Sequence, residues 1–269
     1  MDTQAETPAL EQKAVKPPGK ITRMFMTLYD VCQFVIRFFK EGFLPPYEGK
    51  ELMRQCYEIG YRSLALISLT GFITGIVFTK QSRPSLAEFG ATSWLPSLVG
   101  IAILKTLAAL LTALIAAGKV GSSIGAELGS MRVTEQIDAM EVSATNPFKF
   151  LVTTRVLAAT ITIPILTFYT AMVGLLGSLL NVFLFEDTSG RAFFQSSLES
   201  ITFLDITATT IKSILFGFTI GMVGCYQGYN SSKGTEGVGK AANSAVVIGM
   251  FLIFVEEVVS VQFFGLFRT

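Results

Sequence analysis

Five apolar runs, each approaching the roughly 20 residues that a helix needs to cross a bilayer, constrain the fold of this chain most strongly. The runs cover residues 63–79, 95–117, 156–185, 206–226 and 245–267. Hydrophobic residues make up 51% of the 269 residues and charged residues only 15%, whereas a soluble domain carries about 25% charged residues. The sequence therefore predicts an all-α integral membrane protein with five transmembrane helices.

The first 62 residues precede these runs and follow a different pattern. Residues 1–20 are polar and end in Pro-Pro-Gly-Lys, which predicts a disordered cytoplasmic tail. In residues 21–62, bulky apolar side chains alternate with charges at helical spacing and two prolines divide the segment, which predicts two interfacial helices. Residues 63–269 would then form the transmembrane domain.

Lysines and arginines between the apolar runs predict the orientation, since cytoplasmic segments of membrane proteins carry more of them. With the N-terminus inside, the cytoplasmic side holds the basic N-terminal region together with Lys119, Arg132, Lys149, Arg155, Lys233 and Lys240. The opposite side keeps only Lys80, Arg83, Arg191 and Arg268. We therefore expect a cytoplasmic N-terminus and, after five spans, a C-terminus on the outer side.

The residue inventory excludes several classes of protein. The chain contains no histidine, so a Ser-His-Asp triad and an HExxH zinc site are impossible. Its three cysteines are far apart and form neither a CxxC pair nor a disulfide framework. The net charge is only +1 and no basic cluster has interleaved aromatics, so nucleic acid is not an expected partner. No Walker A loop occurs, and we predict no catalytic residue, metal ligand or cofactor on this chain.

A ladder of three glycines follows the second apolar run. Gly121, Gly125 and Gly129 are spaced four residues apart, so they fall on one helix face and let a second backbone approach closely. Glycine pairs elsewhere in the chain are compatible with ordinary packing inside the membrane. Because this glycine ladder is denser than such packing usually requires, we predict that it brings helices of two subunits together.

A short amphipathic helix is predicted after the glycine ladder, over residues 134–144. Thr134 is the expected N-cap, and acids follow in the first turns, where the helix dipole favours negative charge. An isolated helix of about ten residues is marginal in water, so this one is expected to rest on a partner. Its candidate contact residues are Thr134, Glu135, Gln136, Ile137, Asp138 and Met140.

Ionisable side chains inside the apolar runs are further candidates, because a charge at the bilayer centre costs at least about 2.5 kcal/mol and tends to face a cavity or a partner. These residues are Lys105, Lys212, Glu256 and Glu257, with Glu127 near the cytoplasmic boundary. For Lys212, pairing with Asp205 or reaching the surface is the alternative to a functional role. For Glu127, cations in its own helix are poorly spaced, so its partner is expected on another helix or in another subunit.

One pattern is dense enough to suggest a family. It consists of Glu127, Leu128, Gly129, Met131, Arg132, Thr134, Glu135, Gln136, Ile137, Asp138, Ala139, Met140, Asn146, Pro147, Leu151 and Arg155. This pattern closely resembles the signature of the MlaE (YrbE) family of ABC-transporter permeases, and the resemblance runs from about Gly60 to the C-terminus. The chain departs from the family pattern in two places. Leu104–Ala109 reads LKTLAA where the family typically has Leu-Arg-Glu-Leu-Gly-Pro, and Thr154 stands where the family has a proline.

The resemblance implies a membrane subunit that moves phospholipids between inner and outer membranes. It implies a homodimer in the bacterial inner membrane, a periplasmic MCE-domain protein, and a cytoplasmic ABC ATPase that would bind the ATP and magnesium. The helix of residues 134–144 would then couple to the ATPase, while Glu127, Lys105 and Glu256 would line the gate or the lipid cavity.

Two other classes remain open from the residues alone. An ion-coupled secondary transporter could use Glu256, Glu257 and Lys105 as a relay, but it would need internal repeats or broken helices around a midplane site, and no convincing repeat is present. An intramembrane enzyme would have to rely on a Glu, Lys or Cys in a geometry that the sequence does not suggest. Copurification of an ATPase subunit would separate the permease from both.

Overall fold

The computed structural model describes residues 20–42, 45, 48–185 and 189–266, and all regular structure within these ranges is helical. Five helical stretches are long and apolar enough to cross a membrane: Gly49–Glu88, Thr92–Val133, Phe148–Leu184, Phe203–Tyr229 and Thr235–Leu266. The predicted all-α class and number of spans are therefore confirmed, and the protein is a multi-pass membrane protein. Each stretch exceeds its apolar run, because polar turns extend the helices at their ends.

The N-terminal part contains two helices before the first long apolar helix. They are α1 (Lys20–Gly42) and α2 (Gly49–Ile59), and a short 3₁₀ turn at Tyr61–Ser63 joins α2 to α3 (Leu64–Glu88). The first span thus takes its length from α2 as well as α3. Of the predicted tail, residues 1–19 lie outside the described residues, as does Pro46 of the predicted break. That α1 and α2 lie in the membrane interface stays a prediction.

The second span is built from three α-helical segments joined by wide π-helical turns. The segments are α4 (Leu95–Ala102), α5 (Ala108–Ala116) and α6 (Ser122–Val133), and the turns are Ile103–Leu107 and Ala117–Gly121. A π-helical turn shifts backbone carbonyls out of the regular hydrogen-bond pattern and often marks a functional site. Lys105 lies in the first of these turns, and its carbonyl is used by another helix, as described below.

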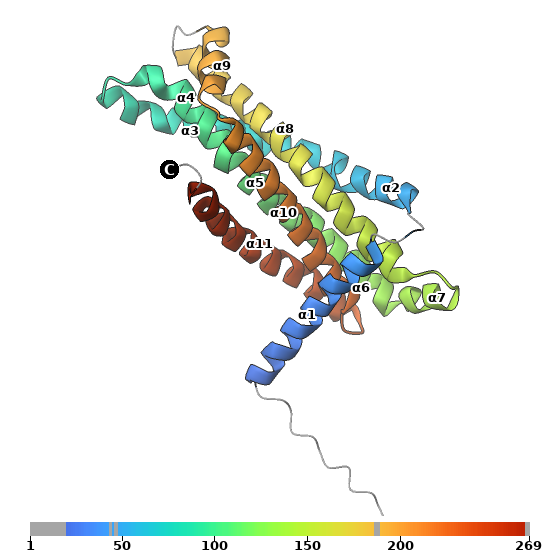
Figure 1. Ribbon diagram of the computed structural model, residues 1–269. Helices are drawn as coiled ribbons and strands as arrows, with labels where there is room; N and C mark the ends of the chain where they lie inside the picture. Colours follow the sequence, from blue (N-terminus) through green and yellow to red (C-terminus); the bar gives the residue numbers. More distant parts are fainter. Residues whose placement is uncertain (1–19, 43–44, 46–47, 186–188, 267–269) are drawn as a thin grey trace, which may run out of the picture.

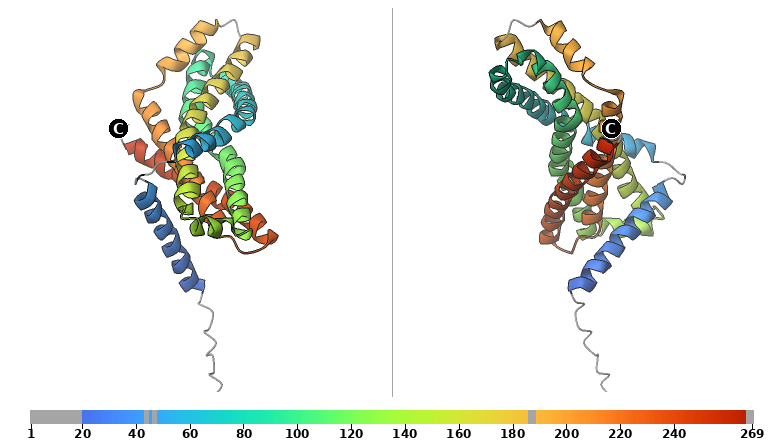
Figure 2. Two further views of the ribbon diagram at one scale, coloured as in Figure 1. Left: turned by 90° about the vertical axis from the view of Figure 1, so that its right-hand side faces the viewer. Right: turned by 60° about the vertical axis from the view of Figure 1, so that its left-hand side comes forward.

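The remaining helices complete the bundle. They are α7 (Gln136–Val142), α8 (Thr154–Phe185) after a π-helical turn at Phe148–Thr153, α9 (Gly190–Glu199), α10 (Phe203–Tyr229) and α11 (Thr235–Leu266). In Figure 1, α7 lies at one end of the bundle and α9 at the other. Helix α8 packs against α3 and α10, and α11 packs against α10 and α6. Figure 2 shows α1 meeting the bundle with its C-terminal half while its N-terminal half extends away.

The glycine ladder faces two helices of its own chain. A Cβ atom at Gly125 would lie 3.2 Å from the Ala241 carbonyl oxygen of α11, and a Cβ atom at Gly228 of α10 would lie 2.9 Å from the Gly125 carbonyl oxygen. The turn at Gly234, which has a φ of 97°, returns α11 alongside α10, so both helices occupy the ladder face of α6. The glycine ladder thus packs against α10 and α11 of the same chain, and the predicted contact between two subunits stays a prediction.

Substituting Gly125→Leu is expected to destabilise the fold by about 1–3 kcal/mol, because the new side chain would clash with the backbone of α11 and push the two helices apart. Ser123→Leu is the matched control, since Ser123 is exposed on the same helix. The measurement is the midpoint of thermal unfolding of each purified variant in mild detergent. Equal midpoints for the two leucine variants would show that α6 and α11 are not closely packed at Gly125.

Candidate functional site

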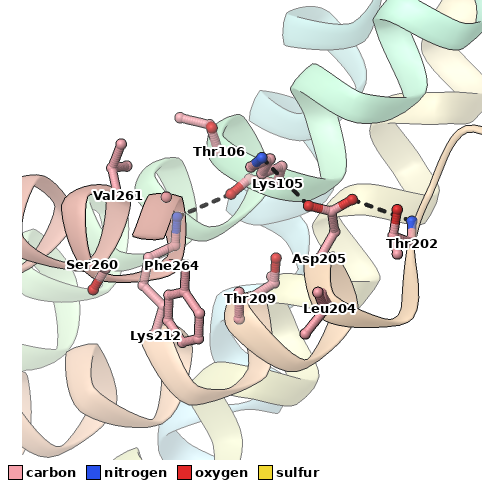
Figure 3. Close-up of a pocket in the computed structure, with 12 residues that line it drawn as sticks. Lys105, Thr106, Thr202, Leu204, Asp205, Thr209, Lys212, Ser260, Val261 and Phe264 are labelled. Atoms are coloured by element: carbon pink, nitrogen blue, oxygen red, sulfur yellow. Dashed lines mark hydrogen bonds and ion pairs between the residues drawn. The ribbon is translucent and has the colours of Figure 1, made fainter. Parts of the chain in front are cut away.

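Figure 3 shows a pocket of about 280 Å³, here called the outer pocket because its helical segments lie in the half of the bundle away from α7 (Figure 1). It is lined by Lys105, Thr106, Thr202, Leu204, Asp205, Ala208, Thr209, Lys212, Ser260, Val261, Phe264 and Gly265. These residues come from the π-helical turn of the second span, the beginning of α10 and the end of α11. The outer pocket therefore combines apolar walls with two lysines and an acid.

The π-helical turn of the second span forms one side of the outer pocket, and two of its carbonyl groups accept hydrogen bonds from α10. The carbonyl oxygen of Leu104 accepts a hydrogen bond from the Thr209 hydroxyl at 3.3 Å. The carbonyl oxygen of Lys105 accepts one from the Lys212 ammonium at 2.9 Å. A carbonyl oxygen has two lone pairs and can accept such a bond in addition to one from its own helix, so α10 is bound to the second span through the side chains of Thr209 and Lys212.

Asp205 is held at the start of α10 by a capping box with Thr202, in which its carboxylate accepts the Thr202 backbone N–H at 3.2 Å. The same carboxylate lies 3.4 Å from the Lys105 ammonium. The Lys105 side chain is 35% exposed and the Asp205 side chain 10% exposed. Lys105 is thus the cation of the outer pocket that a ligand can reach, and Asp205 is a fixed, mostly buried partner.

Lys212 belongs to a second, more deeply buried ion pair. Its ammonium lies 2.9 Å from a carboxylate oxygen of Glu257 on α11, and the two side chains are 6% and 11% exposed. The alternative that Lys212 reaches the surface is wrong, because its side chain is only 6% exposed; its ion-pair partner is Glu257, while Asp205 has Lys105 beside it. Lys212 therefore ties α10 to the second span and to α11.

Glu256, one residue earlier on α11, faces a different neighbour. Its carboxylate accepts a hydrogen bond from the Thr219 hydroxyl of α10. Glu256 is not among the residues that line the outer pocket, whereas Lys212, the partner of Glu257, is. Adjacent residues on a helix point about 100° apart, which explains why the two acids have different surroundings.

Glu127 meets its partner in the half of the bundle that carries α7. A Glu127 carboxylate oxygen lies 2.8 Å from a guanidinium nitrogen of Arg155 on α8. The Arg155 side chain is 2% exposed and that of Glu127 is 47% exposed, and Arg155 also donates to the Leu151 carbonyl oxygen at 3.0 Å. The partner thus lies on another helix of the same chain, and the pair joins α6 to α8 on either side of α7.

Helix α7 is shorter than predicted and begins differently. It covers Gln136–Val142, and its N-cap residue is Glu135, whose φ of 58° lies in the left-handed region. Thr134 does not cap it, because the Thr134 hydroxyl donates back to the Ser130 carbonyl oxygen at 2.9 Å as α6 ends. Instead, a bond of 2.6 Å between Arg132 and Asp138 fixes α7 against the end of α6.

The two faces of α7 differ in character. Ile137 is fully buried in the main core and Met140 packs against it, so these two residues anchor the helix and are not free for a partner. The exposed face carries Glu135, Gln136, Asp138 and Glu141, followed by Val142, which is 89% exposed. A partner would therefore meet an acidic surface with an exposed apolar side chain at its end.

The predicted site residues thus lie at two separate levels. Lys105 lines the outer pocket, while Glu127 lies 22 residues further along the same span, about 33 Å away for a rise of 1.5 Å per residue. The sequence interpretation gave no role to Glu141, named Asp205 only as a possible partner of Lys212, and named Arg155 only as a basic residue and a member of the family pattern. The Thr-x-x-Asp capping pattern at Thr202 was a usable signal for Asp205, because it predicts a carboxylate fixed at a helix start.

Within the described residues, no group of three or more His, Cys, Asp or Glu side chains could hold a metal ion. The charged side chains of the outer pocket have partners on neighbouring helices: Lys105 pairs with Asp205, and Lys212 pairs with Glu257. The arrangement is suited to binding a ligand with an anionic group and an apolar portion, since a reachable ammonium stands beside apolar walls.

Comparison with known proteins agrees with this picture. The profile of the family described as Permease MlaE matches residues 52–263. A probable ABC transporter permease of Rickettsia prowazekii is 37% identical over 220 residues, covering 82% of this chain and 85% of the relative. A probable ABC transporter permease of Synechocystis is 35% identical over 235 residues, covering 84% and 88%.

A more distant relative comes from a plant. The chloroplastic protein of Arabidopsis thaliana named TRIGALACTOSYLDIACYLGLYCEROL 1 is 31% identical over 215 residues, which cover 80% of this chain and 61% of that protein. The family match spans most of the chain and includes all five candidate membrane spans almost completely. This chain therefore belongs to the MlaE permease family and is a membrane permease of an ABC transporter.

Proposed function

We propose that this permease moves phospholipids between the inner and outer membranes of a bacterium, driven by a separate cytoplasmic ABC ATPase that binds the ATP and magnesium. The outer pocket carries this proposal, because the reachable Lys105 ammonium lies beside the apolar side chains of Leu204, Val261 and Phe264. A phospholipid offers a phosphate for the ammonium and acyl chains for the apolar walls. The plant relative named after a glycerolipid supports a lipid substrate.

The proposed assembly contains two copies of this permease in the inner membrane, two ATPase subunits on the cytoplasmic side and a periplasmic MCE-domain protein. Helix α7 would couple to the ATPase, since its acidic exposed face suits a basic surface and its buried Ile137 transmits force to the core. ATPase closure would then shift the packed spans as rigid bodies. The excess of cytoplasmic lysines and arginines supports a cytoplasmic N-terminus and a periplasmic C-terminus.

Lys105→Gln is expected to lower ATP-dependent phospholipid transfer about tenfold, because a charge-assisted hydrogen bond to a phosphate contributes about 1.5–3 kcal/mol. Lys80→Gln, which changes an exposed lysine of α3, is the matched control and should transfer lipid normally. The measurement is transfer of a labelled phospholipid between vesicles that contain the permease together with its ATPase. Equal transfer by both variants would show that Lys105 does not bind the substrate. Transfer that needs an ion gradient and no ATP would instead support an ion-coupled transporter.

A further inference from the structure

The C-terminal half of α1 lies across the start of the third span, directly after α7. The ring of Phe34 packs edge-on against Phe148, with ring centres 4.9 Å apart, and against Tyr226 at 5.4 Å. The Arg37 guanidinium lies 4.3 Å from the centre of the Phe148 ring, within the range of a cation–π contact. Helix α1 is therefore docked onto the protein rather than joined to it only by the chain.

A row of three polar contacts continues from α1 to the backbone of the third span. The Arg37 Nε donates to one oxygen of Glu41 at 2.7 Å. The Asn146 amide Nδ2 donates to the other Glu41 oxygen at 2.9 Å. The Asn146 Oδ1 in turn accepts the backbone N–H of Lys149 at 3.2 Å. We call this row the Arg37–Glu41–Asn146 clamp.

The clamp holds the chain shortly after the end of α7. Helix α7 ends at Val142, and a turn follows in which Ala144 has a φ of 58° and Thr145 donates its backbone N–H to the Met140 carbonyl oxygen. Asn146 is the next residue, and its side chain is the one that reaches α1. On the other flank, α7 is held by Arg132 and Asp138. The short helix is thus fixed on both sides, once by α6 and once by α1.

We propose that Glu41 is a positioning residue, which holds α7 in register through Asn146 and makes α1 part of the coupling between ATP hydrolysis and transport. This inference rests on the proposed role of α7. Glu41 itself would touch neither the ATPase nor the lipid. Without its contact, α7 would still be anchored by Ile137, but its C-terminal flank could move when the ATPase pushes on it, so that part of the motion would be lost.

Asn146→Asp tests the clamp without removing the cap of the third span, because aspartate accepts a backbone N–H as well as asparagine does. The new carboxylate would face the Glu41 carboxylate and repel it. We expect the amount of lipid transferred per ATP hydrolysed to fall about two- to fivefold, the range expected for an exposed charge contact. The complex is assayed as the full permease with its ATPase in vesicles.

A second substitution that restores the contact tests whether Glu41 acts by positioning α7 or whether Asn146→Asp only damages the fold. Adding Glu41→Gln to Asn146→Asp provides an amide that donates to the aspartate, and the ratio should return to the wild-type value. Glu48→Gln changes an exposed acid that lines one groove together with Glu41 and Asn146, and it should have no effect. An unchanged ratio for Asn146→Asp, or a lowered ratio that Glu41→Gln does not restore, would overturn the inference.

A reference variant distinguishes failure of the clamp from failure of the proposed function. Reversing charge at Glu135 and Asp138 alters the exposed face of α7 directly and should uncouple the complex. If this reference uncouples and Asn146→Asp does not, α7 keeps its role and the clamp is refuted. If the reference retains normal lipid-stimulated ATP hydrolysis, association and transfer, α7 is not the coupling helix and the inference about Glu41 falls with it.

Discussion

Glu127→Lys is expected to lower ATP-driven lipid transfer at least tenfold while the protein remains folded and in the membrane. The Glu127 carboxylate lies 2.8 Å from the buried Arg155 guanidinium and joins α6 to α8. A lysine would repel that guanidinium, and, because position 127 is about half exposed, it could turn outward and leave Arg155 with the Leu151 carbonyl. The two helices on either side of α7 would then no longer move together.

The measurement is phospholipid transfer in vesicles that contain the ATPase, normalised to the amount of permease in the membrane. Ser123→Lys adds the same charge at an exposed position of α6 and should transfer lipid normally. Glu127→Gln, which can still accept a hydrogen bond from Arg155, should transfer lipid at a rate between those of Glu127→Lys and Ser123→Lys. Full transfer by well-expressed Glu127→Lys would show that transport does not need the pair of Glu127 and Arg155.

Lys212→Met is expected to have the largest effect on stability, about 3–5 kcal/mol. The substitution leaves the Glu257 carboxylate, whose side chain is 11% exposed, without its cationic partner inside a membrane-spanning bundle. It also removes the bond to the Lys105 carbonyl, so the π-helical turn of the second span loses a contact with α10. The measurement is the thermal unfolding midpoint in mild detergent.

A second substitution tests whether the loss comes from the unpaired acid. Replacing Glu257 by Leu in the Lys212→Met background removes the buried charge, and apolar replacement of a whole buried ion pair is often neutral or stabilising. The double variant should therefore regain most of the decrease in the thermal unfolding midpoint that Lys212→Met causes. Lys80→Met, at an exposed position of α3, controls for the loss of a lysine. A double variant less stable than Lys212→Met would mean that the two residues do not form a pair.

The candidate site was only partly predictable, as three particular residues show. Lys105 was identified because any lysine inside an apolar run is costly and needs a reason. Glu256 was favoured over Glu257, although Glu257 pairs with Lys212, which lines the outer pocket. The two positions differ by one residue, and only the rotation of α11 decides between them. Thr134 fits the preference for an N-cap residue, yet it is the C-cap of α6, and its hydroxyl donates back to the Ser130 carbonyl oxygen.

The sequence by itself determined the all-α class, the five spans and the family, because the length of an apolar run and a local signature are properties of a single segment. Backbone polar groups inside a bilayer must be satisfied by helices or by closed barrels, and apolar runs that approach 20 residues have the length of a spanning helix rather than of a barrel strand. The tertiary structure decided the pairs Lys212–Glu257, Lys105–Asp205 and Glu127–Arg155, as well as the helices that the glycine ladder meets. Such contacts join residues distant in sequence, and they depend on how each helix is rotated and packed against its neighbours, which no single segment encodes.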